Sequence, residues 1–254
     1  MSYGSLLPEV AELLAVYDAQ LRVHIPDRQP QGARVEQDGP VLRISGLRDR
    51  GFVVYRSLGG LEGADLDELI ARQVQVFGAR GERFEWKLHG HDRPTDLRQR
   101  LRSAGFVHEE QETVMIAATS KIAGPPQLPG GVTLRSATGR RDLDRIAALE
   151  QTVWSEDHTW LAESLEAERD ADPDAIAIVI AEAGRTVVCA GWLRFESRTE
   201  FATLWGGATL PVWRRRGIYR ATVRTWRLRA ASPSSKLMLP ATVGRFSNVS
   251  ASPR

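Results

Sequence analysis

Residues 204–221 read Leu-Trp-Gly-Gly-Ala-Thr-Leu-Pro-Val-Trp-Arg-Arg-Arg-Gly-Ile-Tyr-Arg-Ala. This stretch predicts the end of a β-strand, a turn that opens at Pro211, and a helix that runs to about Arg229. Gly217 lets the backbone approach a ligand closely, because no Cβ is in the way. The first amides of a helix have no partner inside it and carry the positive end of its dipole. Three arginines around such amides predict a site for a phosphate or pyrophosphate.

The same residues carry a family resemblance. Arg214-x-x-Gly217-x-Tyr219 resembles the Arg/Gln-x-x-Gly-x-Gly/Ala acyl-CoA signature of the GNAT superfamily of N-acetyltransferases, and Thr209-Leu210-Pro211 is similar to the end of that family's fourth strand. Tyr219 departs from the signature, and its side chain is expected to point away from the pyrophosphate. The resemblance implies a mixed α/β fold, acetyl-CoA as co-substrate, and direct acyl transfer to a small-molecule or peptide amine.

The resemblance also implies which residues bind acetyl-CoA. The backbone of the fourth strand would support the pantetheine arm and the thioester carbonyl, at Ala208, Thr209 and Leu210. The pyrophosphate would lie on Arg214, Arg215, Arg216, Gly217, Ile218, Tyr219, Arg220 and Ala221. Ordinary sheet core is the alternative for the strand positions. A solvated basic helix start is the alternative for the arginines.

Two further functions stay open. One is a non-catalytic CoA-binding or regulatory protein of the same fold. The other is a nucleic-acid-binding module, which ranks last because its arginines spread around the predicted helix instead of forming one stripe. Those arginines are Arg214, Arg215, Arg216, Arg220, Arg224, Arg227 and Arg229.

Carboxylates near strand ends are the candidates for a general base that relays a proton through water. Glu196 and Glu200 are the predicted catalytic residues, and Glu182 is a third candidate. A solvated charge at a strand end is the alternative for each of them.

The segment between the first two helices of the second half lies where the resembled family commonly shapes its acceptor pocket. It contains Glu156, Asp157 and His158, which we expect to bind a cationic amine. The alternative is a helix-linking loop in which Ser155 and Asp157 act as caps.

Length and composition limit the other possibilities. A chain of 254 residues with 42% hydrophobic and 26% charged residues is typical of one large or two ordinary globular domains. A net charge of +2 provides no general field for nucleic acid or an anionic membrane. Cys189 is the only cysteine, which favours a reducing compartment, and it lies in a predicted apolar strand as a buried small hydrophobe. We expect a cytoplasmic protein, because residues 1–22 do not have the pattern of a signal peptide.

The Pro- and Gly-rich residues 124–131 predict a linker between an N-terminal domain, 1–123, and a C-terminal domain, 132–254. Hydrophobic periodicity predicts helices over 6–21, 64–77, 94–104, 142–153 and 160–168. It predicts strands over 41–45, 52–56, 84–88, 113–117, 132–136, 175–181, 186–195 and 201–210, with a bulge at Gly206 and Gly207. The first half lacks the acyl-CoA signature, but residues 84–113 resemble a GNAT-type β-α-β unit. The predicted fold is therefore two tandem GNAT-like lobes, the first one degenerate.

Two segments stand apart from this pattern. His89-Gly90-His91-Asp92 has no further ligands at a recognised metal-binding spacing, so it predicts a surface turn and no metal. The tail 231–254 contains no Asp or Glu and has one strand-like run at 237–243. The resembled family continues with a strand, a helix and two more strands, so we expect the second lobe to be truncated or read out of frame. Such a sheet would have an open edge beside the acyl-CoA site.

Overall fold

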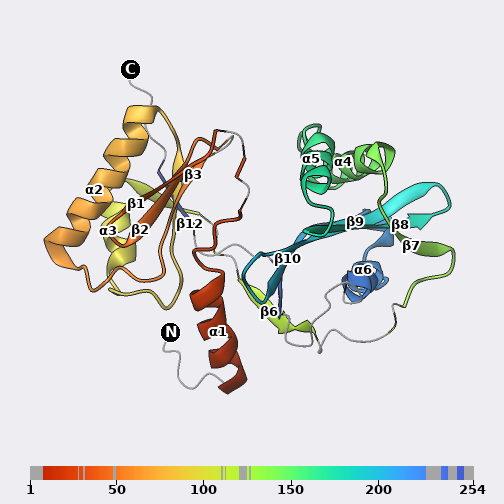
Figure 1. Cartoon of the computed structure of the whole chain (residues 1–254), viewed down its shortest axis with the longest axis horizontal. Helices are drawn as coiled ribbons and strands as arrows, with labels where there is room; N and C mark the ends of the chain where they lie inside the picture. The colour runs from red at the N-terminus through yellow and green to blue at the C-terminus, as the bar shows by residue number, and fades with distance from the viewer. Residues whose placement is uncertain are drawn as a thin grey trace. The chain divides into compact units, whose positions relative to one another are not determined.

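The computed structural model describes residues 8–27, 29, 30, 32–47, 50–109, 111, 113–119, 125, 127–226, 236–239 and 245–248. The chain divides into two compact units (Figure 1). Unit 1 comprises residues 1–114 and 241–254, and unit 2 comprises residues 115–240. Of the predicted helix end near Arg229, the part beyond Trp226 lies outside the described residues.

The two units differ from the predicted domains because strands are exchanged between the two halves of the sequence. Strand β6 (Met115–Ala118) precedes the predicted linker, yet it pairs with β11 (Lys236–Leu239) in the sheet of unit 2. Strand β12 (Arg245–Asn248) follows the second half, yet it pairs with two strands of unit 1. The Pro- and Gly-rich residues 124–131 therefore do not mark the division between the two units.

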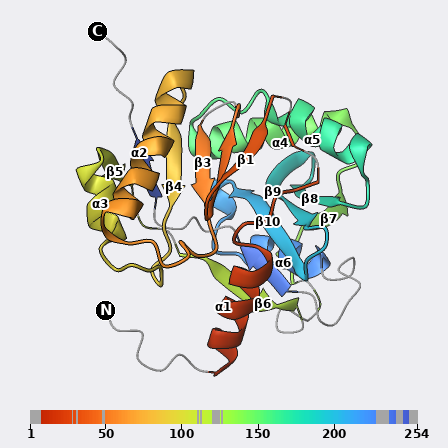
Figure 2. The ribbon, with the colours of Figure 1, turned by 60° about the vertical axis from the view of Figure 1, so that its left-hand side comes forward.

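Unit 1 is a six-stranded mixed sheet in the order β1-β2-β3-β4-β12-β5. Its other strands are β1 (Arg34–Asp38), β2 (Val41–Ser45), β3 (Gly51–Val54), β4 (Phe84–Lys87) and β5 (Phe106–His108). Helix α1 (Pro8–Gln20) precedes the sheet, and α2 (Gly63–Arg80) and α3 (Leu97–Ser103) pack on one face of it (Figure 1 and Figure 2). The core between these helices and the sheet contains Phe77 stacked on Phe84, with their ring centroids 4.1 Å apart.

Sequence patterns missed β1 and β5. Strand β1 reads Arg-Val-Glu-Gln-Asp and is mostly exposed, while β5 has three residues. The predicted β-α-β unit is also modified, because β12 lies between β4 and β5 and is antiparallel to both. No local pattern in the tail predicts this insertion, since the pairing partners are distant in sequence.

The segment from His89 to Asp92 is a turn, but the prediction of a surface turn was wrong. His89 and Asp92 are only 8% and 9% exposed. Asp92 accepts hydrogen bonds from the Arg22 guanidinium, the Tyr55 hydroxyl and the His89 amide. The Tyr17 hydroxyl of α1 lies 3.0 Å from His89 Nε2. Burial, together with the nearby Arg22 charge, lowers the pKa of His89 to about 2, so this imidazole is neutral.

Removal of the Asp92 carboxylate tests this buried network. Asp92→Ala leaves the buried Arg22 guanidinium only its longer ion pair with Asp18, 3.5 Å, and loss of one member of a buried ion pair costs about 3–5 kcal/mol. We expect a melting temperature well below that of the wild type in scanning calorimetry. Asp96→Ala is the control, because Asp96 pairs with Arg100 at a more exposed position in the same unit. Equal melting temperatures for the two variants would show that the network does not stabilise unit 1.

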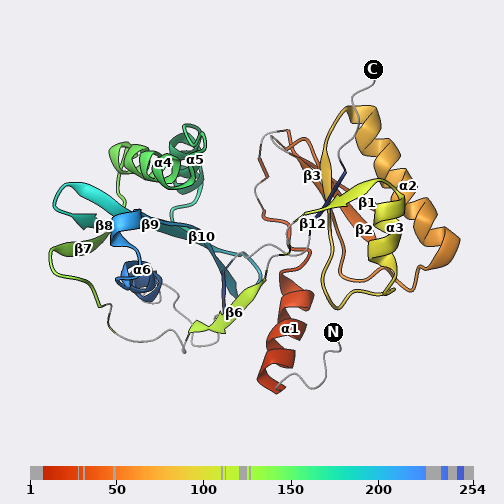
Figure 3. The same cartoon turned by 180° about the vertical axis from the view of Figure 1, so that it is seen from behind.

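Unit 2 is a six-stranded mixed sheet in the order β6-β11-β10-β9-β8-β7. Its remaining strands are β7 (Val132–Ser136), β8 (Ile176–Ala183), β9 (Thr186–Phe195) and β10 (Phe201–Thr209). Helices α4 (Arg140–Trp154) and α5 (Leu161–Ala171) cover one face, and α6 (Ile218–Trp226) covers the other (Figure 1 and Figure 3). Strand β8 is buried on both faces from Ile176 to Ala181, as its aliphatic sequence predicted.

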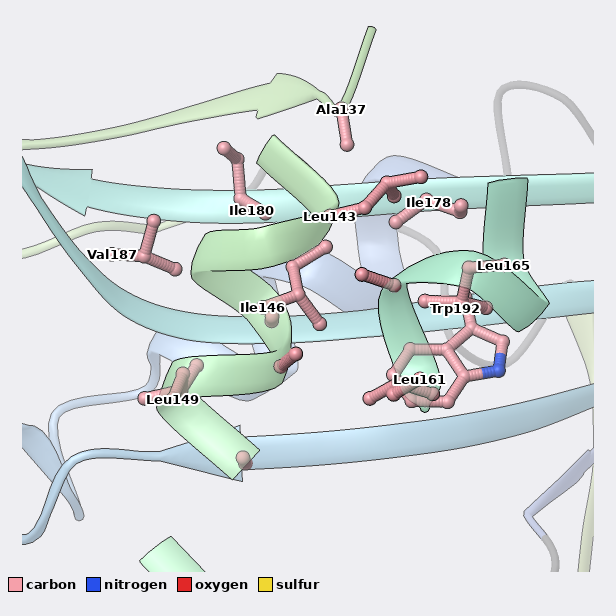
Figure 4. Close-up of a cluster of buried hydrophobic side chains, with 14 of the residues drawn as sticks. Ala137, Leu143, Ile146, Leu149, Leu161, Leu165, Ile178, Ile180, Val187 and Trp192 are labelled. Atoms are coloured by element: carbon pink, nitrogen blue, oxygen red, sulfur yellow. The ribbon is translucent and has the colours of Figure 1, made fainter. Parts of the chain in front are cut away.

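The core beneath α4 and α5 fixes how these helices lie on the sheet. Leu143 and Ile146 of α4 and Leu165 of α5 are fully buried, and they pack against Ile180 of β8 and Trp192 of β9 (Figure 4). Figure 4 shows the Trp192 indole beside α5, with the α4 side chains further along the same face. Residues that follow on the α4 stripe are therefore directed toward β9 and β10.

The tail forms part of this sheet. Strand β11 overlaps the predicted strand 237–243, of which residues 240–243 lie outside the described residues. It runs parallel to β10, and on its other side it pairs antiparallel with β6. A strand from the first half of the sequence, β6, therefore covers the outer edge of β11. Among the helices that the structure describes, none has the length and hydropathy needed to cross a membrane.

Candidate functional site

The predicted bulge in β10 is confirmed. Gly206 and Gly207 have φ of 71° and 86°, and the register with β9 shifts between Gly206 and Thr209. A Cβ on Gly206 would lie 2.4 Å from the Trp192 ring, and one on Gly207 would lie 2.9 Å from the Tyr219 ring. Both positions therefore require glycine for their backbone conformation and for space.

From Leu204 onward, β10 pairs with only one of the described strands, β9. Its pairing with β11 runs from Phe201 to Thr203, whereas its pairing with β9 continues to Thr209. Within the described strands, the β11 side of β10 is therefore unpaired from Leu204 onward. The predicted pantetheine-binding residues Ala208, Thr209 and Leu210 follow on this segment, and the Leu210 amide donates to Val188.

The chain then turns into α6 through the short 3-10 helix η2 (Pro211–Trp213). The first hydrogen bond of α6 runs from the Ala221 amide to the Gly217 carbonyl, 3.0 Å. For the amides of residues 215–220, the described part of the chain provides no hydrogen-bond acceptor. Gly217 itself is exposed, with φ 77°, and nothing lies nearer to its Cβ direction than the Gln127 carbonyl oxygen, at 3.9 Å. The mouth of α6 is thus a row of amides without acceptors among the described residues, and it is exposed from Arg215 to Gly217, while Ile218 is buried.

The arginines at this turn are exposed and have no carboxylate within ion-pairing distance among the described residues. Arg214 Nε donates to the Thr209 carbonyl, 3.0 Å, which ties the turn to the end of β10. The Arg216 guanidinium lies over the Trp213 ring, 5.0 Å from its centroid. Arg215 has φ 63°, which is uncommon for a non-glycine residue. Uncompensated guanidinium groups beside free amides make this turn suited to an anion.

Tyr219 stands at the position where the resembled signature has Gly or Ala. Its ring packs on Gly207 and on the apolar cluster that contains Cys189 and Ile218. The ring is therefore directed at the sheet, and burial raises its pKa to about 12. Cys189 is fully buried, as predicted, and burial raises its pKa to about 11, so it is a poor nucleophile.

Sequence analysis missed a buried carboxylate next to the bulge. Glu150 of α4 is 3% exposed, and its Oε2 accepts a hydrogen bond from Trp154 Nε1, 2.7 Å. Burial raises its pKa, against the Trp154 hydrogen bond, the His158 charge and the Ala208 amide, which lower it. The signal was present in the sequence: Glu150 continues the apolar helical stripe of Leu143 and Ile146, where a charged residue is out of place.

The predicted catalytic residues lie elsewhere. Glu196 and Glu200 belong to the hairpin before β10, and Glu196 Oε1 accepts from Thr203 Oγ1, 2.6 Å. Thr203 is three residues before Gly206, which is about 10 Å along an extended strand. The structure therefore does not bring these two carboxylates to the bulge.

Glu182, the third candidate, lies in a basic hollow of about 550 Å³ at the start of α4. It pairs with Arg135 and Arg145, and the Arg135 hydrogen bond lowers its pKa. Asp142 in the same hollow also pairs with Arg135, whose hydrogen bond lowers the Asp142 pKa to about 2. Internal carboxylates thus neutralise much of this hollow, in contrast to the turn before α6.

The predicted acceptor residues lie in the exposed loop between α4 and α5. Asp157 accepts hydrogen bonds from the Thr159 amide and hydroxyl, so it stabilises the loop as the alternative interpretation expected. The His158 ring stacks on Trp160, with centroids 6.2 Å apart, and its charge acts on Glu150. Glu156 is exposed. Within the described residues, no group of His, Cys, Asp and Glu side chains is arranged to hold a metal ion.

Comparison with known proteins gives the class of fold. No protein-family profile matches the sequence, and no curated protein matches it. A GCN5-related N-acetyltransferase from Kribbella flavida is similar in structure, with a TM-score of 0.65 and 12% identity over 96% of this chain and 95% of that chain. A tandem GNAT protein from the clavulanic acid biosynthesis pathway has a TM-score of 0.60 and 11% identity, over 86% and 83% of the two chains. A GCN5-related N-acetyltransferase from Sphaerobacter thermophilus has a TM-score of 0.60 and 14% identity, over 97% and 86%.

These similarities define the fold of the chain. The chain has the mixed α/β fold of GCN5-related N-acetyltransferases, and the likeness extends over nearly its whole length. The fold expected from residues 204–221 is therefore confirmed.

Glu150 makes the stability of unit 2 depend on pH. Its folded-state pKa lies above the value of 4.5 for a free glutamate, so the folded protein retains this proton to a higher pH than the unfolded chain. The free energy of unfolding therefore falls as the pH rises through this interval. Glu150→Gln removes the dependence, so its melting temperature should exceed that of the wild type by a margin that is larger at pH 8 than at pH 4.

The matched control has the opposite sign. Arg135 lowers the pKa of Glu182, so Glu182→Gln should lower the melting temperature at pH 8. A Glu150→Gln variant that melts below the wild type at pH 8 would contradict the assignment of Glu150 as an uncompensated buried carboxyl.

Proposed function

We propose that this protein is an acyl-CoA-dependent N-acyltransferase that transfers an acetyl group from acetyl-CoA to a primary amine by direct attack in a ternary complex. The observation that carries the proposal is the mouth of α6. Free amides of residues 215–220 and the exposed guanidinium groups of Arg214, Arg215 and Arg216 form an anion site at the end of β10. The fold supports the same function, because the proteins from Kribbella flavida and Sphaerobacter thermophilus that share it are named as GCN5-related N-acetyltransferases.

The proposed roles follow from the order of these features. The pyrophosphate of CoA would bind the amides from Gly217 to Arg220, where helix dipole and guanidinium groups both favour negative charge. The pantetheine arm would lie along the unpaired edge of β10. The thioester would then be near Ala208, where the bulge directs backbone groups away from the regular ladder. An amide donor at the carbonyl oxygen stabilises the charge that develops there during transfer.

Isothermal titration calorimetry with CoA tests the binding part of this proposal. Gly217→Glu places a carboxylate among the free amides, where it repels the pyrophosphate. We expect CoA affinity to fall by about 100-fold or more, equivalent to about 2.7 kcal/mol. Gly217→Gln is the matched neutral control and should lose less, because it adds the same bulk without charge.

A second control separates this effect from backbone strain. Gly184→Glu puts the same side chain on another exposed glycine of unit 2, with φ 60° in the hairpin between β8 and β9. It should bind CoA as the wild type does. A wild-type protein that binds no CoA, or a Gly217→Glu variant with unchanged affinity, would contradict the proposed site.

Release of the CoA thiol from acetyl-CoA in the presence of amines tests the catalytic part. Release that depends on the amine supports the transferase. CoA binding without release across a panel of amines would favour a non-catalytic CoA-binding protein. A steep fall of duplex DNA affinity with salt, with no effect of CoA, would favour a nucleic-acid-binding module.

A further inference from the structure

Glu150 differs from the other buried carboxylates of the described residues. Glu85 pairs with Arg50 and Lys87, Asp92 pairs with Arg22, and Asp142 pairs with Arg135. Among the described residues, no arginine or lysine pairs with Glu150. A buried carboxylate without a cationic partner is costly for a folded protein. Such a group persists where a ligand supplies the missing charge.

The hydrogen bonding of Glu150 is also incomplete. Trp154 satisfies Oε2, but Oε1 is buried and no described group makes a hydrogen bond of normal geometry to it. The remaining acceptor capacity suits a donor with a positive charge, since charge-assisted hydrogen bonds are the stronger ones. A primary ammonium group has that charge and three N–H donors.

Glu150 lies where acyl transfer would take place. The Ala208 amide acts on its carboxyl group, and the Glu150 charge raises the pKa of Cys189, which pairs with Thr209 across β9 and β10. Ala147 and Leu149, the α4 neighbours of the buried Glu150, belong to the same core cluster as Ala208, so the carboxylate lies near the bulge at Gly206 and Gly207. Under the proposed function, this is the part of β10 that holds the thioester.

The surroundings of Glu150 favour an amine with an apolar body. The Trp154 indole that donates to Glu150 is 54% exposed, and Trp160 in the following loop is 43% exposed. Exposed indole rings bind apolar groups and cations. The same loop carries the exposed carboxylates of Glu156 and Asp157, which would repel an acceptor that has its own carboxylate.

We infer that Glu150 holds the ammonium group of a primary amine that has an apolar body and no carboxylate, and that it takes one proton from this group. The inference rests on the proposed function. The neutral amine then attacks the acyl carbon of acetyl-CoA, the C–N bond forms and the C–S bond breaks. The CoA thiolate takes up the second proton that the nitrogen loses, and Glu150 releases its proton to water. The products are the amide, CoA thiol and one proton.

The buried position suits Glu150 to this role. Burial raises its pKa, so its carboxylate is a stronger base than that of an exposed glutamate. The titratable groups that face it are His158 from the loop after α4 and Cys189 from β9. Cys189 stays protonated at neutral pH because burial raises its pKa to about 11.

Calorimetry with phenethylamine and phenylalanine on the CoA-saturated protein tests the binding step. The two probes differ by one carboxylate. We expect the wild type to bind phenethylamine at least about 10-fold more tightly, since a repelled carboxylate costs 1.4 kcal/mol or more. Glu150→Gln should weaken the binding of both probes, because both carry the ammonium group, while its affinity for CoA stays unchanged. Asp144→Asn is the control, because Asp144 is an exposed residue of the same helix that pairs with Arg140.

Kinetics with acetyl-CoA and phenethylamine test the proton transfer. Glu150→Gln should lower kcat/KM at pH 7 by about 100-fold, with most of the loss in kcat, as is typical for removal of a general base. The wild-type pH profile of kcat/KM should have an acidic limb that the variant lacks. A purely structural role of Glu150 would leave the acidic limb of the profile unchanged.

The outcomes separate this inference from the function on which it rests. If the wild type binds neither CoA nor acetyl-CoA, the proposed function fails and this inference fails with it. If the protein binds CoA but binds phenylalanine as tightly as phenethylamine, or if Glu150→Gln binds phenethylamine as tightly as the wild type does, the inference alone is overturned.

Discussion

A row of backbone amides without acceptors, at the point where β10 turns into α6, is the constraint on which the site depends. Arg215, Arg216 and Gly217 are exposed, so water can satisfy their free amides. Several arginines at the positive end of a helix dipole are unfavourable on their own. An anion bound at the turn would explain why the arginines and the free amides lie together. The anion would accept hydrogen bonds from the amides and neutralise the guanidinium groups.

The bulge in β10 couples this turn to the rest of the sheet. Gly206 allows the Trp192 ring of the α4 and α5 face to lie against the strand, and Gly207 does the same for Tyr219 on the α6 face. A side chain at either glycine would displace one of these rings. The sheet core, the start of α6 and the unpaired edge of β10 are therefore fixed by the same short segment, and the buried Glu150 lies directly beside it.

The sequence predicted those parts of the fold that depend on local patterns. Strands β7 and β9 have the predicted bounds because alternation and flanking turn residues are sufficient to define them. The placement of β12 between β4 and β5 was not predictable, since it depends on pairing between distant residues. The turn at His89 was misjudged for the same reason, because Tyr17 of α1, distant in sequence, buries it. Glu150 was predictable from its place on the apolar stripe of α4, whereas the carboxylates predicted as bases lie at strand ends.

The most direct test of the account is an NMR titration of the ¹⁵N-labelled protein with CoA, which reports on individual amides. The account predicts the largest chemical-shift changes at Gly217, Ile218 and Tyr219, with smaller changes along Ala208 to Leu210. Changes confined to another part of unit 2, such as the Arg135 hollow at the start of α4, would contradict it. So would the absence of any change at the mouth of α6 under saturating CoA.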